Sequence, residues 1–558
     1  MDITSNMINM TLGDLLDDCA AKHPDNDALV YVDRGLRYSY KQFNEICRQA
    51  AKAFMKIGVK KGDHVAIWAA NYPQWVISMF ATAKIGAVLV TVNTSYKIFE
   101  AEYLLKQSDS STLVMMDGLK DSDYIGIINS LCPTLAESAP GELDSEKLPY
   151  LKRVIYVGDN ETPAGMFGWD DFMAFGDSVT DAELDAVQRS LDIHDVVNMQ
   201  YTSGTTGFPK GVMLTHYNIV NNGFYIGEKM KFTDKDRLCI PVPFFHCFGC
   251  VLAIMASVTH CTTMVPIDAF SPVAVMRSIE TERCTAVHGV PTMFIFTLEH
   301  PDFEKYDLSS LRTGIMAGSP CPIEIMKLAM NKMGMHEIVI TYGQTEASPA
   351  CTMTSTDDPI DRRVSTVGQA MYSVECKIVD PETNEILPPG ATGEFCARGY
   401  NIMKGYYKME EATKSVIDAD NWLHTGDLAT VDEEGYYKIV GRVKDMIIRG
   451  GENIYPREIE ELLYTHPDIS DVQVVGVPSK ALGEEIMAYI IVREGVTLTE
   501  EDVQQFVREN MARHKVPKYV AIIDAFPMTA SGKIQKYKLR DMAVERYNLQ
   551  EDASVETA

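Results

Sequence analysis

The chain has little positive charge for its length. Its 558 residues include 51 lysines and arginines against 78 aspartates and glutamates, a formal net charge of −27. Nucleic acids and anionic membranes are bound by basic surfaces, so this balance argues against both as partners. The first 16 residues contain Asp2 and Asp14 but no lysine or arginine. A secretory signal or a transit peptide carries basic residues, so neither is predicted and a cytoplasmic location is expected.

Long hydrophobic runs are also scarce. The uncharged run Leu238–Ile267 is long enough to suggest a membrane span, but it contains Pro241, Pro243 and His246 and has no basic cluster beside it. Such a run is more typical of a strand, a turn, a buried helix and a second strand. We therefore predict no transmembrane segment. The sequence indicates no oligomeric state.

Paired sets of cysteines of the kind that bind zinc are missing. The twelve cysteines are scattered through mostly apolar surroundings, and without a secretory signal they are interpreted as buried thiols. Cys247 and Cys250 have the spacing of a redox or zinc motif. Because no second pair lies at a matching distance, coincidence explains this spacing better than a metal site.

What the chain does have is a loop rich in glycine and hydroxyl side chains. Between Tyr201 and Val212 lie three glycines, four serine or threonine side chains and one lysine. Glycine lets the backbone approach an anion closely, so the loop is typical of a polyphosphate cradle, although a flexible connector has a similar composition. The candidate phosphate-binding residues are Thr202, Ser203, Gly204, Thr205, Thr206, Gly207 and Lys210.

This loop differs from the common phosphate-binding loop of kinases and ATPases. That motif has Gly-Lys followed by serine or threonine and runs directly into a helix. Here Lys210 lies between Pro209 and Gly211, and the apolar run that follows is typical of a strand. We therefore predict strands over Val196–Gln200 and Val212–Leu214, with the loop between them.

Alternating strands and helices predict an α/β fold with large, parallel-rich sheets and packed helices. A capping box at Ser39 and Gln42 starts an early helix. In the middle of the chain, three strands each run into a tight turn and are expected to continue as helices. In open α/β sheets such turns line the ligand crevice. The turns are Gly289-Val290-Pro291, Gly318-Ser319-Pro320 and Gly343-Gln344-Thr345-Glu346.

The pattern changes to short strands and turns from Gly393 onward, and it changes again near Asp445. We predict a large N-terminal domain over residues 1–441 that includes a β-subdomain, a hinge at 442–445, and a small, mobile C-terminal α+β domain over 446–558. The basic stretch Gly532–Arg540 is interpreted as a tail. No internal repeat is visible.

Five motifs occur in a specific order. They are the loop Thr202–Lys210, Tyr342-Gly-Gln-Thr-Glu346, Thr425-Gly-Asp427, Gly441-Arg-Val-Lys-Asp445 and Gly532-Lys533. Together they resemble the adenylate-forming superfamily of acyl-CoA synthetases, luciferases and nonribosomal adenylation domains, over essentially the whole chain. Within that superfamily the chain looks most like the medium-chain and broad fatty acyl-CoA synthetases.

The resemblance implies a binding site for ATP. It implies that Thr202–Lys210 closes over the β- and γ-phosphates, that Tyr342 stacks on adenine, and that Asp427 and Arg442 hold the ribose. Gly318, Ser319 and Gly343 would lie near the adenine. Four residues would be catalytic: Thr345 beside the α-phosphate, Glu346 as the Mg²⁺ ligand, Lys533 at the α-phosphate and the carboxylate, and His246.

The resemblance also implies where the other substrates bind. The acyl-binding site would be formed by Phe245, His246, Cys250, Gly289 and Val290. Gly450 and Gly451 would line a tunnel for CoA. Lys444 would be the residue about which the small domain turns.

The implied reaction is the ATP-dependent activation of a carboxylic acid, a medium- to long-chain fatty acid, to an acyl-adenylate. The acyl group then passes to CoA, with release of AMP and pyrophosphate, and Mg²⁺ is the implied cofactor. Alternatives are an acyl-AMP ligase that loads a carrier-protein thiol, a luciferase-like enzyme, and a non-catalytic acyl or nucleotide sensor.

Each proposed site residue has a plain structural explanation as well. Glu346 could be a carboxylate in the first turn of a helix, and Asp427 a turn-forming residue. Tyr342 and His246 could belong to the core, and Lys533 could be one more solvated lysine.

Overall fold

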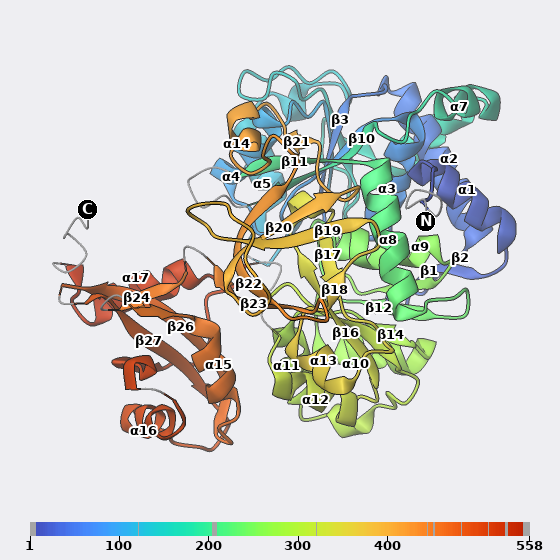
Figure 1. Ribbon diagram of the computed structural model, residues 1–558. Coiled ribbons are helices and arrows are strands. Elements are labelled where there is room, and N and C mark those ends of the chain that lie inside the picture. The colour runs from blue at the N-terminus through green and yellow to red at the C-terminus, as the bar shows by residue number, and fades with distance from the viewer. Residues whose placement is uncertain are drawn as a thin grey trace.

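The computed structural model describes residues 7–120, 122–202, 209–319, 321–442, 445–449, 452–480, 482–511, 513–529 and 534–550. Buried hydrophobic residues form one large core cluster within residues 12–437 and two smaller clusters within residues 447–549. Figure 1 shows the C-terminal part of the chain at the left, beside the larger part.

An eight-stranded sheet carries the glycine-rich loop. Its order is β21-β11-β10-β4-β3-β5-β8-β9, with parallel pairing from β10 to β9 and antiparallel pairing at β11 and β21. The predicted strands on either side of the loop are confirmed, and Lys210 begins a strand, not a helix. The strands are β3 (His64–Trp68), β4 (Val88–Thr91), β5 (Thr112–Met115), β8 (Arg153–Tyr156), β9 (Phe167–Gly168), β10 (Val196–Thr202), β11 (Lys210–Thr215) and β21 (Gly405–Tyr406).

A nine-stranded sheet lies beside the first. Its order is β18-β17-β16-β15-β14-β12-β13-β1-β2, with parallel pairing from β16 to β1 and antiparallel pairing at both edges. The strands are β1 (Asp27–Tyr31), β2 (Leu36–Ser39), β12 (Arg237–Ile240), β13 (Thr263–Pro266), β14 (Ala286–Val287), β15 (Thr313–Met316), β16 (Glu337–Gly343), β17 (Ala350–Met353) and β18 (Gln369–Ala370). The predicted α/β fold with parallel-rich sheets is confirmed.

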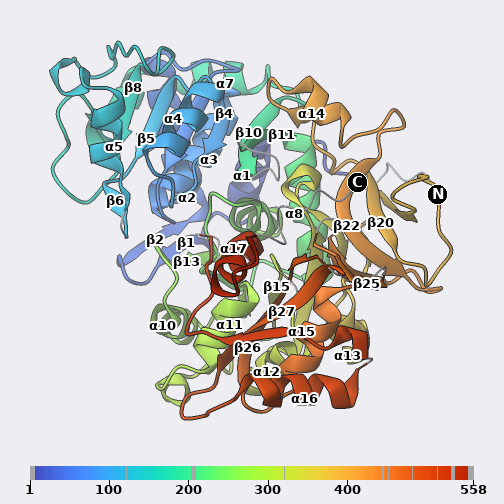
Figure 2. The same ribbon diagram turned by 90° about the vertical axis from the view of Figure 1, so that its left-hand side faces the viewer.

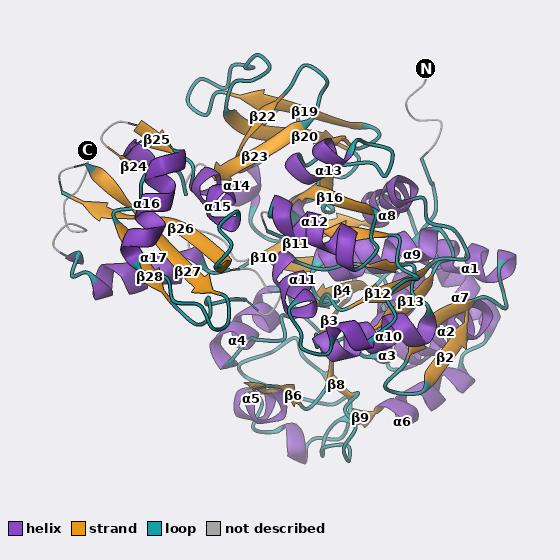
Figure 3. Ribbon diagram, turned by 90° about the horizontal axis from the view of Figure 1, so that it is seen from below, coloured by secondary structure: helices purple, strands orange, loops and turns teal. Residues whose placement is uncertain are grey.

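Helices flank these sheets (Figure 3). The capping box predicted at Ser39 and Gln42 is present at the start of α2. The helices of this part are α1 (Leu12–Lys22), α2 (Tyr40–Lys56), α3 (Pro73–Ile85), α4 (Ile98–Gln107), α5 (Tyr124–Leu131), α6 (Trp169–Ala174), α7 (Asp181–Gln188), α8 (His216–Met230), α9 (Ala256–Thr259), α10 (Pro272–Glu282), α11 (Pro291–Leu298), α12 (Ile323–Lys332), α13 (Ile360–Ser365) and α14 (Glu410–Lys414).

Two further sheets, of four and five strands, follow, and a small two-stranded sheet pairs β6 (Gly118–Leu119) with β7 (Ser122–Asp123). A four-stranded antiparallel sheet holds β19 (Val374–Val379), β20 (Gly393–Gly399), β22 (Leu423–Val431) and β23 (Tyr437–Arg442). The C-terminal sheet holds β24 (Ile447–Arg449), β25 (Glu452–Ile454), β26 (Ile469–Ser479), β27 (Gly483–Val492) and β28 (Tyr519–Ile522). Its helices are α15 (Pro456–Tyr464), α16 (Glu500–Asn510) and α17 (Lys536–Arg546).

The C-terminal part contacts the larger part near α11 and α12. In Figure 1, α15 lies on the side of the C-terminal part that faces these helices, and Figure 2 shows the C-terminal part in front of them. Arg493 forms an ion pair with Glu299 at 2.9 Å, and the Ser470 hydroxyl lies 3.2 Å from the same carboxylate. Two contacts use main-chain atoms. Arg457 donates to the carbonyl of Cys321, and a Glu461 oxygen accepts from the Ile323 amide, each at 3.5 Å.

The uncharged run Leu238–Ile267 folds as predicted, into β12, a π-helical segment (Phe248–Met255) with α9, and β13. Across the described ranges, no helix is long and apolar enough to cross a membrane. The helix predicted after β16 is wrong. One helical turn, Thr345–Ala347, is followed by β17, because Ser348 has a left-handed φ of 70° and Pro349 has no amide hydrogen to continue a helix.

The predicted C-terminal tail is wrong from Lys536 onward, where the chain forms α17. Leu539 and Ala543 are buried in a core cluster with strands of the C-terminal sheet. The interpretation of all cysteines as free thiols also needs correction. Cys19 and Cys261, 242 residues apart, form a disulfide. The other ten are free and, apart from one that is half-buried, are buried.

Candidate active site

One group of polar side chains joins the nine-stranded sheet to the four-stranded one. The Tyr342 hydroxyl, on β16, donates to Asp427 Oδ2 at 2.8 Å, and Nε of Arg442 lies 2.9 Å from Asp427 Oδ1. The charge of Asp427 raises the pKa of Arg442, against the effect of burial. Burial, and then the same charge, raises the pKa of Tyr342 well above its usual value. Tyr342 is therefore a fixed donor and Arg442 a fixed cation.

Backbone geometry explains why these side chains meet. Asp427 on β22 is paired in register with Arg442 on β23. Gly426 has a left-handed φ of 70°, which glycine adopts without strain. A Cβ on Gly343 would lie 1.8 Å from the Pro349 carbonyl oxygen, so glycine is needed for β17 to lie this close to the end of β16.

A hydrogen-bonded network lies beside Asp427. Glu394 lies 2.9 Å from His424 Nδ1 and accepts from the Gly426 amide at 2.9 Å. The other ring nitrogen of His424 lies 3.5 Å from Asp418. Glu394, His424 and Cys396 place metal-capable atoms within 4.8 Å of one another. Because both ring nitrogens already face carboxylates, we interpret the network as an anchor for the turn that carries Asp427.

A second group surrounds Glu346, in the turn after β16. Its Oε1 accepts from the Tyr406 hydroxyl at 2.7 Å and lies 3.5 Å from Thr202 Oγ1. The Lys210 ammonium lies 4.9 Å from the centre of the Tyr406 ring. Glu346 is only 9% exposed, so these partners largely replace water around its carboxylate. The structure thus brings three predicted residues, Thr202, Lys210 and Glu346, together around Tyr406. The sequence did not predict Tyr406 as a site residue.

Strand pairing places this second group. Thr202 ends β10 and is paired with Lys210, the first residue of β11. Tyr406 on β21 is paired with Val212 on β11. Glu346 lies in the turn that joins β16 to β17 of the nine-stranded sheet, so its contacts link the two large sheets. Only three residues separate Tyr342 from Glu346, and the two groups therefore lie at the two ends of one short turn.

Two contacts through Cys247 connect the predicted acyl-site residue His246 to Thr345. His246 Nδ1 lies 3.6 Å from the Cys247 sulfur, and that sulfur lies 3.6 Å from Thr345 Oγ1. Burial raises the pKa of the Cys247 thiol to about 12, so it stays protonated near neutral pH. Cys247, which sequence reasoning took only as half of a chance pair, therefore bridges two candidate catalytic residues.

The other predicted acyl-site residues, which include Gly289, are all buried. Phe245, Cys250 and Val290 are 7%, 1% and 4% exposed. Cys250 accepts from the Gln200 side-chain amide at 3.0 Å. Gly289 and Gly318 mark two of the predicted turns: a Cβ on Gly318 would lie 3.1 Å from Val290, and one on Gly289 would lie 3.0 Å from Phe294. Ser319 follows Gly318 and is half-buried.

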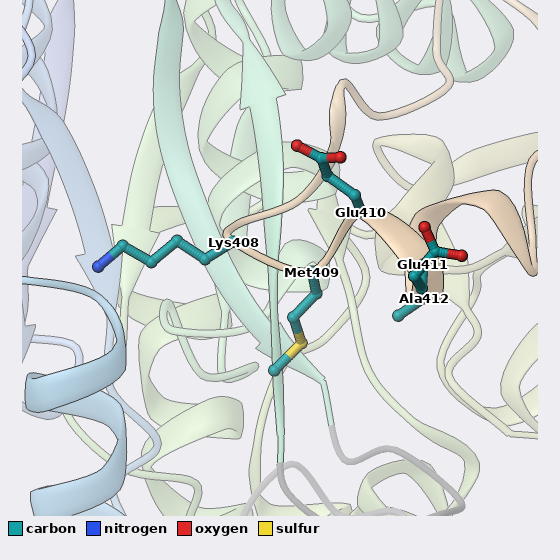
Figure 4. A pocket seen from close by; sticks show the side chains of 5 residues that line it. All are labelled: Lys408, Met409, Glu410, Glu411 and Ala412. Atoms are coloured by element: carbon teal, nitrogen blue, oxygen red, sulfur yellow. The ribbon is translucent and has the colours of Figure 1, made fainter.

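Two cavities are found away from these groups. One, of about 560 Å³, is lined by residues 408–412, and Figure 4 shows the side chains of Lys408 and Glu410 pointing in different directions there. The other, of about 230 Å³, includes Lys61, His64 and Tyr407. Neither contains a predicted site residue, so the polar contacts define the candidate site better than these hollows do.

Several predicted residues lie outside the described part of the chain. They are Ser203, Gly204, Thr205, Thr206 and Gly207 of the loop, the hinge residue Lys444, Gly450 and Gly451 of the CoA tunnel, and Gly532 and Lys533.

The chain matches the AMP-binding enzyme family over residues 16–407 and the AMP-binding enzyme C-terminal domain over residues 458–533. It is 56% identical over 545 residues to YngI of Bacillus subtilis (strain 168), provisionally named an acyl-CoA synthetase, covering 98% of this chain and 99% of that protein. It is 42% identical over 542 residues to the mitochondrial medium-chain acyl-CoA ligase ACSF2 of Danio rerio. This match covers 97% of this chain and 89% of that protein.

Solved structures share the fold. ATP-bound MatB from Rhodopseudomonas palustris has a TM-score of 0.81 and 27% identity, over 97% of this chain and 100% of that one. The anthranilate CoA ligase AuaEII, in complex with anthranoyl-AMP, has a TM-score of 0.86, over 98% of this chain and 100% of that one. At 24% identity, the second likeness shows the fold alone.

Proposed function

The chain belongs to the AMP-binding enzyme family, and from this premise we propose that it is an AMP-forming acyl-CoA synthetase. It activates a carboxylic acid with ATP to an acyl-adenylate and releases pyrophosphate. It then transfers the acyl group to CoA and releases AMP. An acid, ATP and CoA are therefore its substrates.

One observation carries the proposal: the two polar groups at the ends of the turn Tyr342–Glu346. The group around Asp427 offers a buried carboxylate, suited to accept from the two ribose hydroxyls. The group around Glu346 offers a carboxylate, a hydroxyl and the Lys210 ammonium, suited to phosphates with a bridging cation. A nucleotide lying along this turn would have its sugar at one end and its phosphates at the other.

Magnesium fits the second group. Mg²⁺ in phosphate-transfer sites is typically held by one or two carboxylates together with the phosphates of the substrate. Glu346 offers one buried carboxylate, and the hydrogen bonds that this carboxylate accepts from described residues both involve Oε1. Bound there with ATP, Mg²⁺ would neutralise charge on the departing pyrophosphate. Of the residues of this chain, Glu346 would hold it.

In the first half-reaction, the residues of this chain position the substrates and neutralise the charge of the phosphates. Lys210 and the loop residues 202–207 clamp the β- and γ-phosphates, which leave together as pyrophosphate. Lys533 neutralises the α-phosphate and orients the attacking carboxylate, beside Thr345. Positioning and fixed charge supply most of the acceleration in such a displacement.

The second half-reaction requires a different pose of the small domain. We assign residues 1–441 to the large domain, 442–445 to the hinge and 446–558 to the small domain. Turning about Lys444 withdraws Lys533 and brings Gly450 and Gly451 to the site, where they line the path of the CoA thiol. The thiol attacks the acyl carbonyl and AMP leaves. One site with two domain poses explains motifs on both sides of the hinge.

The acid is proposed to be a medium-chain fatty acid, because ACSF2 of Danio rerio is named a medium-chain acyl-CoA ligase. Phe245, His246, Cys250, Gly289 and Val290 are proposed to form the acyl site, and the burial of Phe245, Cys250 and Val290 supports an apolar wall. The cytoplasmic location stays a prediction.

The test is ATP–pyrophosphate exchange across straight-chain carboxylic acids of increasing length, repeated with free CoA. We expect exchange that depends on the acid, with its maximum at medium length, and AMP and thioester formation once CoA is added. Exchange without CoA-dependent thioester would indicate an acyl-AMP ligase that serves a carrier protein. A chain that binds nucleotide without exchange would be a sensor.

A further inference from the structure

Tyr406 lies between the two oppositely charged groups at the phosphate end of the site. Its hydroxyl donates to Glu346 Oε1 at 2.7 Å, and the Lys210 ammonium lies 4.9 Å from the centre of its ring. Tyr406 is 6% exposed. One side chain therefore contacts both the proposed metal ligand and the proposed phosphate clamp.

The backbone fixes Tyr406 from two sides. It is paired with Val212 on β11, the strand that begins with Lys210. Its amide donates to Thr413 Oγ1 at 2.9 Å, and the Tyr407 amide that follows donates to the Gly211 carbonyl at 2.8 Å. The Glu346 carbonyl is held as well, because it accepts from the Met403 amide at 2.8 Å. The phenol and the carboxylate are thus anchored through the same short segment.

Two properties of the phenol suit this place. Its hydroxyl is one donor aimed at one carboxylate oxygen, which leaves the rest of the carboxylate for a cation. The face of its ring attracts a cation such as the ammonium of Lys210.

We propose that Tyr406 is a positioning residue that orients Glu346 for the metal–ATP complex and holds Lys210 beside it. This inference rests on the proposed function of the same site. The hydroxyl restricts the carboxylate to one orientation before ATP arrives, so less ordering remains to be done when metal and phosphates bind. The ring keeps the Lys210 ammonium near the carboxylate without an ion pair between them, so that Lys210 stays available for phosphate.

The experiment compares Tyr406→Phe with Tyr407→Phe. The first variant removes one oxygen and keeps the ring beneath Lys210. The second is a matched control, because the Tyr407 hydroxyl lies 3.0 Å from Asp109 and its ring packs edge-on against His64, away from Glu346. Binding of Mn²⁺–ATP is followed by the electron paramagnetic resonance of free Mn²⁺, without an acid substrate, so that no turnover is needed.

We expect Tyr406→Phe to weaken Mn²⁺–ATP binding by about tenfold, the effect of losing one hydrogen bond to a charged group. AMP, which lacks the β- and γ-phosphates, should bind as it does to the wild type, and Tyr407→Phe should bind both normally. Tyr406→Leu removes the ring as well and should weaken metal-free ATP, because Lys210 is then no longer held. A purely structural role would reduce AMP binding and Mn²⁺–ATP binding alike.

The inference is overturned if Tyr406→Phe binds Mn²⁺–ATP as tightly as the wild type, or if AMP binding falls by the same factor. A Tyr406→Phe protein that does not fold is replaced by Tyr406→His, which keeps a ring and an N–H donor and should show a smaller loss than tenfold. Failure of the proposed function is distinguishable, because the wild type would then bind ATP without acid-dependent exchange of pyrophosphate.

Discussion

Lys84 provides a prediction whose size follows from the structure. It lies on α3 with a fully buried side chain, forms an ion pair with Asp17 at 2.8 Å and donates to the Gly13 carbonyl at 3.1 Å. The Asp17 side chain is 33% exposed and also accepts from Gln188 and Asn44, at 2.7 and 2.8 Å. The buried Lys84 ammonium therefore depends on the Asp17 charge more than the Asp17 carboxylate depends on Lys84.

Removing the two charges one at a time should lower the free energy of unfolding by unequal amounts. Asp17→Asn leaves a buried ammonium without a counter-charge, which costs about 3–5 kcal/mol of unfolding free energy. Lys84→Met leaves a carboxylate that keeps two donors and part of its water, and it adds an apolar side chain to the interior. We expect this change to cost about 1–2 kcal/mol. The double variant should have an unfolding free energy close to that of Lys84→Met alone.

The assay is denaturation by urea, followed by tryptophan fluorescence. The four tryptophans, at positions 68, 75, 169 and 422, all lie before the proposed hinge, so the signal reports on the large domain. The reasoning is refuted if Lys84→Met is as destabilising as Asp17→Asn, or if the double variant costs the sum of the two.

The stability that the Asp17–Lys84 pair contributes should depend on pH in a definite direction. Burial raises the pKa of Asp17, but the Lys84 charge and the three donors outweigh it and hold the pKa below its usual value. Protons then bind more readily to the unfolded state, so stability from this pair is complete above about pH 4 and is lost as the pH falls through the lowered pKa. Burial lowers the pKa of Lys84. Stability therefore also rises with pH in the alkaline range, and Lys84→Met should lack that rise.

Three further changes test the mechanism. Lys533→Ala should slow adenylation by about 10²–10³-fold, the effect of losing one preorganised charge donor, and spare thioester formation from supplied acyl-adenylate; equal losses in the two half-reactions would contradict their separation. Lys444→Pro should leave pyrophosphate exchange largely intact and block thioester formation, because proline stiffens the hinge; loss of exchange would make the hinge assignment wrong. Glu299→Gln breaks the half-exposed pair with Arg493 and should change the ratio of the two half-reaction rates by only about two- to fivefold, measured by rapid quench.

Local patterns predicted the elements around the phosphate loop. The proline and glycine on either side of Lys210 and the apolar run after them are short-range signals, and the two strands lie where these signals place them. The turn after β16 shows where such signals fail. Its residues resemble those of the earlier strand-to-helix turns, but the chain reverses at Ser348 to pair as β17, an outcome set by the neighbouring strand.

Contacts between distant segments could not be predicted. Tyr406 stands beside a second tyrosine, and nothing in the sequence distinguishes the hydroxyl that meets Glu346 from the one that meets Asp109. The pairing of β21 with β11 decides it. The disulfide between Cys19 and Cys261 depends in the same way on the packing of segments 242 residues apart.

The contacts between the two parts of the chain have a consequence for how such a protein can diverge. Arg457 and Glu461, both on α15, meet main-chain atoms of Cys321 and Ile323. A carbonyl and an amide are supplied by almost any residue, so the facing surface can change its side chains without losing these bonds. Glu299 is different, because its partners need a carboxylate. Relatives of this chain could therefore drift at positions 321 and 323 and keep this docking, whereas a change at position 299 would require a matching change at position 493.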